Sequence, residues 1–225
     1  MRDMRKYFEL GGIVAAVVLI VFGAVAVTMG INGRHTVNKS LKSEYIVGSS
    51  DMTPSAIRAE AQKAGIVSSI TEFPTKSVAD QKIDTGAKAR AMAQYMHIHA
   101  LEATQGFTYA QMGIYTAKPG TPKAELMPGG GTDNSAYAAV DPNTKQPLQN
   151  GARQVWVTET ALTTALNTSY MADQIGLFGI VVGIALLLTG FGLAILAIGG
   201  ALRNPATALT FLRRSNPKTP AVPVA

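Results

Sequence analysis

Two stretches without a charged side chain decide the fold: LGGIVAAVVLIVFGAVAVTMGING at Leu10–Gly33 and QIGLFGIVVGIALLLTGFGLAILAIGGAL at Gln174–Leu202. Each exceeds the roughly 20 apolar residues that an α-helix needs to cross the hydrocarbon core of a bilayer. The sequence therefore predicts a mainly α protein with transmembrane helices at 10–31 and 174–202. Residues 32–173 form the domain between them.

A cleaved signal peptide is the alternative interpretation of the first stretch. Arg2, Arg5 and Lys6 precede it, and Ala24-Val25-Ala26 has the small residues of a cleavage site. The apolar run is long for a signal peptide, so we expect a retained anchor. A mature N-terminus at Val27 would indicate cleavage instead.

The charges indicate the topology. Most of the net charge of +6 lies in the tails 1–9 and 203–225, and the segment between the spans is nearly neutral. Basic flanks stay on the cytoplasmic side, which predicts cytoplasmic termini and an extracytoplasmic 32–173 domain. The lipid bilayer, and not nucleic acid, is the expected partner of these charges. The chain has no cysteine, which excludes disulfides and thiolate chemistry.

Local signals predict two helices within the 32–173 domain. Thr53 can cap a helix over 55–64 that begins after Pro54 and ends at Gly65. A longer helix begins after Asp84 or Thr85 and continues to Gly106. The helical spacing of its apolar stripe predicts a core face, formed by Ala89, Met92, Ala93, Met96, Ala100 and Ala103.

The second span is predicted to continue a juxtamembrane helix, so that one helix covers Val155–Leu202. Trp156, near its start, is interpreted as a core anchor, with a ligand contact as the alternative. Between the domain helices and this one, 116–154 is rich in proline and glycine and is predicted to be a long loop. Such a loop is functional, wraps a partner or is disordered. The proline-rich end of the chain is predicted to be disordered.

Small residues recur every seven positions in both spans, and Gly179 forms a Gly-x-x-x-Gly pair with Gly183. Close backbone approach is a principal source of helix packing energy in lipid, so these faces are the predicted assembly sites. They pack the two spans of one chain together, or alternatively one face contacts a neighbouring subunit. The residues are Ala16, Gly23 and Gly30 in the first span and Gly176, Gly179, Gly183 and Gly190 in the second.

No pattern of residues indicates catalysis, a cofactor or a metal. The spans contain no ionisable group, which makes a transport route improbable. His97 and His99 are two residues apart on a predicted helix and cannot converge on one ion, whereas His99 and Glu102 can form a hydrogen bond. We therefore expect no metal site and no enzymatic activity.

The runs MAQYMHIHALEATQG at Met92–Gly106 and NGARQVWVTETAL at Asn150–Leu162, together with the second span, carry a resemblance. The chain resembles a group of actinobacterial two-span membrane proteins of unassigned function, which are often labelled aromatic ring-opening dioxygenases. The resemblance implies a bacterial plasma membrane setting. The residues do not support the dioxygenase label, because His97 and His99 are wrongly spaced for an iron triad.

Three hypotheses for function remain. The first is a non-catalytic structural or accessory membrane protein that self-associates or joins a larger cell-envelope complex. The second is an extracytoplasmic module that binds or senses a lipid or apolar ligand; an apolar pocket lined by Met92, Tyr95 and Met96 would favour it. The third is an ectodomain enzyme. The number of subunits does not follow from the sequence.

Overall fold

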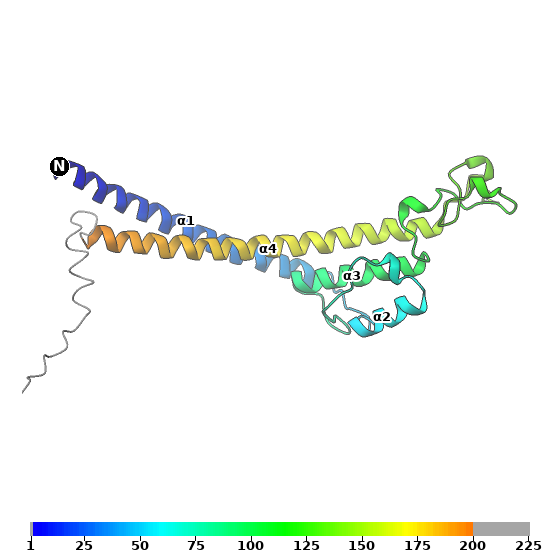
Figure 1. The fold of residues 1–225 in the computed structure, drawn as a ribbon, viewed down its shortest axis with the longest axis horizontal. Helices are drawn as coiled ribbons and strands as arrows, with labels where there is room; N and C mark the ends of the chain where they lie inside the picture. Colours follow the sequence, from blue (N-terminus) through cyan, green and yellow to red (C-terminus); the bar gives the residue numbers. More distant parts are fainter. Residues whose placement is uncertain (1, 200–225) are drawn as a thin grey trace, which may run out of the picture. The chain divides into compact units, whose positions relative to one another are not determined.

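The computed structural model describes residues 2–199 and divides them into two compact units. The span unit contains 2–33 and 175–199, and the helical unit contains 34–174. Within the described residues there is no β-strand, and isolated bridges replace sheets. The main elements, shown in Figure 1, are α1 (Arg2–Ser43), α2 (Pro54–Lys63), α3 (Gly86–Ala103) and α4 (Gly151–Ile198).

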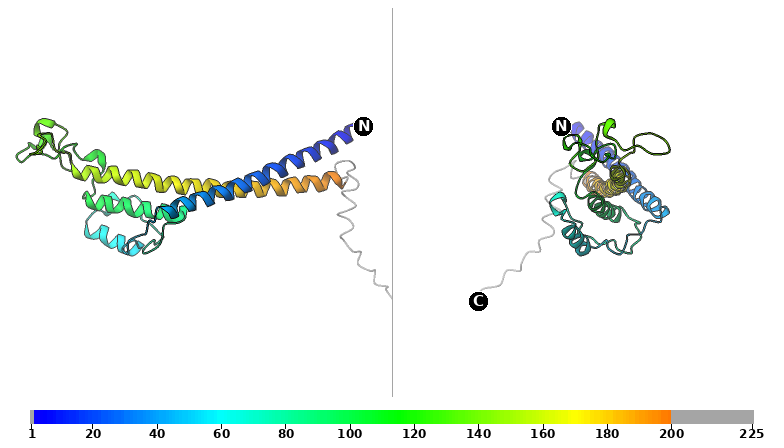
Figure 2. Two further views of the ribbon diagram at one scale, coloured as in Figure 1. Left: turned by 180° about the vertical axis from the view of Figure 1, so that it is seen from behind. Right: turned by 90° about the vertical axis from the view of Figure 1, so that its right-hand side faces the viewer.

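Within the span unit, α1 and α4 lie side by side and run in opposite directions (Figure 2). The prediction of two apolar helices long enough to cross a membrane is confirmed. Only 11% of the most apolar window of α1 and 17% of that of α4 are buried, whereas the core helix of a soluble protein is mostly buried. The outward faces are therefore apolar and uncovered, as lipid-facing helices require.

Both long helices extend beyond the predicted spans. The first ends at Ser43 and not at residue 31, because no glycine or proline interrupts the chain between Gly33 and Gly48. It also includes the predicted N-terminal tail from Arg2 onward. Helix α4 begins at Gly151, four residues before the predicted start at Val155. It is described to Ile198, so the predicted end at residue 202 and the tail 203–225 lie outside the described residues.

The predicted caps of the two shorter helices are present. Thr53 Oγ1 accepts a hydrogen bond from the Ala56 N–H at 3.2 Å at the start of α2, and Pro54 occupies its first turn. Thr85, and not Asp84, caps α3 by accepting from the Lys88 N–H at 3.4 Å. Gly106, with a φ of +83°, follows α3 in the left-handed conformation expected of a chain reversal.

Helix α3 lies between α2 and α4 in the helical unit, as the views in Figures 1 and 2 agree. One core joins Leu41 of α1, Ile57 of α2, Tyr95 and Ile98 of α3, and Leu166 of α4. The predicted stripe on α3 is partly wrong. Ala89, Ala93 and Ala100 are buried, but Met92 and Met96 are half-buried, Ala103 is exposed, and Tyr95 and Ile98 supply the large core side chains.

A second core surrounds Trp156, which is only 5% exposed and packs with Leu101 and Met112. Its indole Nε1–H donates to the carbonyl oxygen of Phe107 at 2.9 Å and contacts Thr104 Oγ1 at 3.3 Å. The indole therefore buries its ring while its polar group keeps a partner. The interpretation of Trp156 as a core anchor is confirmed.

Residues 113–150, called the arm below, account for most of the predicted loop. The arm contains two short 3₁₀ turns, η3 (Lys123–Glu125) and η4 (Ser135–Tyr137), and its backbone is fixed by bridges between distant segments. Tyr115 exchanges backbone hydrogen bonds with Thr132 at 3.0 and 2.9 Å. The backbone of the arm is thus hydrogen-bonded between distant segments, and the last predicted loop residues, 151–154, belong to α4.

Candidate functional site

The predicted glycine faces of α1 and α4 face each other within the span unit. A β-carbon placed on Gly23 would lie 2.8 Å from the carbonyl oxygen of Gly183, and one on Gly183 would lie 2.7 Å from that of Gly23. A β-carbon on Gly30 would lie 2.5 Å from the carbonyl oxygen of Gly176. The two backbones therefore approach so closely that only glycine fits.

The remaining members of the two faces lie in the same helix pair. A β-carbon on Gly190 would lie 3.1 Å from the carbonyl oxygen of Ala16, whose side chain is 1% exposed. Gly179 makes a less close contact, because a β-carbon on it would lie 3.6 Å from the carbonyl oxygen of Ala26. Ala197 is fully buried and continues the seven-residue interval beyond Gly190, although it is absent from the predicted set. These faces are used between two helices of one chain.

The two hydroxyl groups in the spans bond to their own helices. Thr28 Oγ1 donates to the Ala24 carbonyl oxygen and Thr189 Oγ1 to that of Ala185, each at 2.8 Å. Such bonds satisfy the hydroxyl in an apolar setting without a second polar group.

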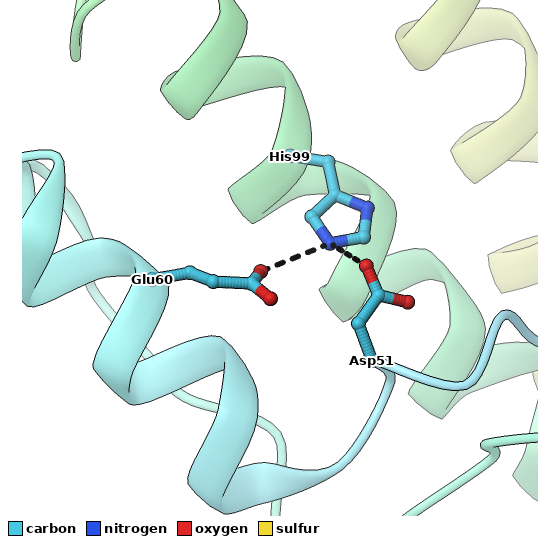
Figure 3. Close-up of side chains that lie close together, drawn as sticks. All are labelled: Asp51, Glu60 and His99. Atoms are coloured by element: carbon cyan, nitrogen blue, oxygen red, sulfur yellow. Dashed lines mark ion pairs between the residues drawn. The ribbon is translucent and has the colours of Figure 1, made fainter.

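A second candidate site lies in the helical unit, where three ionisable side chains from separate segments meet (Figure 3). His99 Nε2 lies 3.6 Å from Asp51 Oδ2 and 3.7 Å from Glu60 Oε2. The side chains of Asp51, Glu60 and His99 are 41%, 34% and 29% exposed. Figure 3 shows the imidazole directed into the space between the two carboxylates. We call this group the His99 triad.

Local structure fixes each member of the His99 triad. Asp51 precedes the capped start of α2, next to Met52, which is 5% exposed and anchors this turn in the core. Glu60 lies on α2, and His99 lies on α3 between the buried residues Ile98 and Ala100. The Ser49 hydrogen bond lowers the pKa of Asp51, burial opposes this, and the charge of His99 lowers the pKa further. Asp51 is therefore ionised at neutral pH.

The predicted hydrogen bond between His99 and Glu102 is replaced by these longer-range contacts. His97, two residues away, faces α4, where its Nδ1 lies 3.1 Å from Oε1 of the buried Glu159. Its ring also makes an edge contact with Trp156, with centroids 5.3 Å apart. The two histidines thus have different surroundings, as their spacing predicts. The sequence contained no signal for Asp51 or Glu60 as neighbours of His99.

An apolar groove opens on the helical unit between α1, α3 and α4, with a cavity of about 380 Å³. Met92 and Met96 line it, as the ligand-binding hypothesis requires, but Tyr95 does not. Tyr95 is fully buried in the core, and its hydroxyl donates to the Lys76 carbonyl oxygen at 3.1 Å. The other lining residues are Ser40, Leu41, Glu44, Ile46, Leu162, Ala165, Leu166 and Ser169.

Comparison with known proteins gives no relative: no family model, curated protein or solved structure matches the chain. Function must therefore be argued from the sites themselves.

Proposed function

We propose that this chain is a non-catalytic accessory protein of the bacterial plasma membrane that joins a larger envelope complex through the arm. Both termini lie in the cytoplasm and the helical unit lies outside. The observation that carries the proposal is that the arm has a defined backbone but almost no core of its own. The glycine faces are engaged within the chain, so the contact with a partner is assigned to the helical unit.

The arm buries only Gly113, Thr132 and Ala138, and none of its large apolar side chains is buried. Short hydrogen-bonded segments without a packed face are marginally stable in water. The arm nevertheless presents apolar side chains to solvent, and burying them on a partner would stabilise it. They are Ile114, Leu126, Val140 and Leu148, which are 38% to 56% exposed.

The chemistry of the arm favours a protein partner. Its basic side chains, Lys118, Lys123 and Lys145, are balanced by Glu125, Asp133 and Asp141, so it has no charge suited to nucleic acid or anionic lipid. The part of α4 from Gly151 to Gln174 rises about 36 Å at 1.5 Å per residue. This length separates the arm from the other end of this α4 segment, within the helical unit.

Two aspartate substitutions in the arm are expected to release the chain from its complex. In membranes of the native host solubilised in mild detergent, the wild-type chain should migrate as a particle larger than one chain with its micelle. Val140→Asp combined with Leu148→Asp should convert most of it to the single-chain size, because a charge at each position opposes burial. Native gel electrophoresis with detection of the chain measures this shift.

Val67→Asp provides the matched control, since Val67 is 43% exposed and lies outside the arm. It should leave the complex intact. Cross-linking through Val140→Cys identifies the partner, because the natural chain has no cysteine that would react in addition. A cross-link to a second copy of the chain would indicate self-association. A wild-type chain that is monomeric and forms no cross-link would refute the proposal.

Binding of a lipid or apolar ligand is the second candidate function, and the groove beside Met92 and Met96 supports it. Its cavity of about 380 Å³ falls within the range of small-molecule pockets, which are mostly lined by apolar side chains. Two flexible methionines suit an irregular apolar ligand.

Filling this groove should displace such a ligand. Met96→Trp is expected to reduce the lipid that co-purifies with the chain at least tenfold, measured by mass spectrometry of an organic extract. Val157→Trp is the control, because Val157 is 48% exposed on α4 and does not line the groove. Equal lipid in both variants and the wild type would eliminate this function.

A further inference from the structure

We propose that the His99 triad binds one divalent transition-metal ion, with Zn²⁺ as the expected occupant. Asp51, Glu60 and His99 each offer one ligand atom, and these three atoms all lie within 4.8 Å of one another. The inference goes beyond the proposed function and does not depend on it. It also revises the sequence-based expectation that the chain has no metal site.

The distances fit ligands around a shared ion better than they fit direct hydrogen bonds. The separations of 3.6 and 3.7 Å from His99 Nε2 to the carboxylate oxygens exceed the usual range for hydrogen bonds. Two ligands bound at 2.0–2.2 Å to a tetrahedral zinc lie about 3.4 Å apart. Each carboxylate oxygen is thus within a few tenths of an ångström of the separation from His99 Nε2 that a shared ion requires, and the two carboxylates, which lie within 4.8 Å of each other, can close on the ion by side-chain rotation.

Two atoms of the triad lack the partners that their burial demands. His99 Nε2 and Asp51 Oδ1 are both inaccessible to solvent, and neither has a hydrogen-bond partner. Buried polar atoms without partners are rare in folded proteins, and for His99 Nε2, which faces both carboxylates, a bound ion is one explanation. Asp51 would bind the ion through Oδ2, the oxygen nearer to the imidazole. The side chains as a whole remain a third exposed, so an ion can enter and water can complete its coordination.

The donor set selects the class of metal. One imidazole nitrogen with two carboxylate oxygens suits Zn²⁺ and its neighbours Co²⁺ and Mn²⁺, whereas Ca²⁺ and Mg²⁺ prefer oxygen alone. Three protein ligands leave at least one position for water. The ion would join the turn before α2, α2 itself and α3. This connection is useful in a chain without cysteine, because no disulfide can join these segments.

The test uses the full chain in detergent, without a histidine tag and stripped of metal with a chelator. Co²⁺ is the probe, because its visible absorption reports coordination by nitrogen and oxygen. We expect one Co²⁺ per chain, displaced by Zn²⁺. The midpoint of thermal unfolding should rise by about 5 °C at a Zn²⁺ concentration one hundred times the dissociation constant.

Variants separate a metal site from a simple ion pair. His99→Ala and Glu60→Gln should each weaken Co²⁺ binding at least tenfold, whereas His97→Gln, two residues away on the same helix, should bind like the wild type. Glu60 is on the surface of α2, so Glu60→Gln keeps the test valid if His99→Ala does not fold. The proposal fails if the wild type shows neither the Co²⁺ spectrum nor the thermal shift. It also fails if His97→Gln loses binding as His99→Ala does.

Discussion

Replacing Gly183 by valine is expected to lower the free energy of unfolding by about 3 kcal/mol, at the upper end of the usual cost of overpacking. A β-carbon at this position would lie 2.7 Å from the carbonyl oxygen of Gly23 and 2.8 Å from the backbone nitrogen of Val27. Backbone atoms cannot rotate away as a side chain can. The two helices must separate, and the dispersion contacts along their whole interface weaken together.

Titration with SDS in mixed micelles, followed by far-ultraviolet circular dichroism, measures this loss. Gly192→Val is the matched control, because Gly192 lies in the same helix and no atom of the facing helix lies within 4 Å of its potential β-carbon. Equal stability of the two variants would contradict the packing of the spans described above. A change in oligomeric state without a loss of stability would indicate that the glycine face contacts another copy.

The sequence predicted the glycine contacts because their cause is local and periodic. A seven-residue interval keeps small side chains on one side of each helix, and an antiparallel pair brings two such faces together. The same seven-residue interval, continued from Gly190, leads to Ala197, which the predicted set did not include. The ends of the helices were less predictable. The loss of apolar character after Gly33 predicted the end of the membrane-crossing part, whereas the helix itself continues to Ser43.

The starts of α2 and α3 were predicted to within one residue, because Thr53 and Thr85 act on backbone groups of the next turn. The His99 triad could not be predicted in this way. Its members are brought together by the packing of α2 on α3, and nothing in the spacing of residues 51, 60 and 99 encodes that packing. The sequence instead favoured Glu102, the neighbour of His99 along the helix. Long-range packing therefore determines which side chains contact His99.

One long-range contact did have a signal in the sequence. Arg34 is the first charged residue after the first apolar stretch, and Asp173 is the last before the second. In an antiparallel pair of helices these two residues lie at the same end of the apolar stretches, and their charges are opposite. Arg34 Nε donates to Asp173 Oδ1 at 2.9 Å. Asp173 also packs against the start of α3, where a β-carbon on Gly86 would lie 3.2 Å from Asp173 Oδ2.

Arg34→Met is expected to cost about 3 kcal/mol of stability, near the lower limit for breaking a buried ion pair. The Asp173 side chain is only 6% exposed, so its carboxylate would lose its cation without gaining water. The positive end of α3 offsets part of this cost. Asp173→Asn should cost less, because the Arg34 side chain is 38% exposed and water can solvate its free guanidinium.

The double variant, with Arg34→Met and Asp173→Asn, tests the cause of the loss. If the cost arises from an unpaired buried carboxylate, removing its charge should restore at least half of the stability lost in Arg34→Met. The same SDS titration measures all three variants. Additive losses in the double variant would contradict this cause and would indicate that each side chain acts through its own packing. Recovery would mean that the buried Asp173 carboxylate on α4 requires a cation, and that Arg34 supplies it from α1.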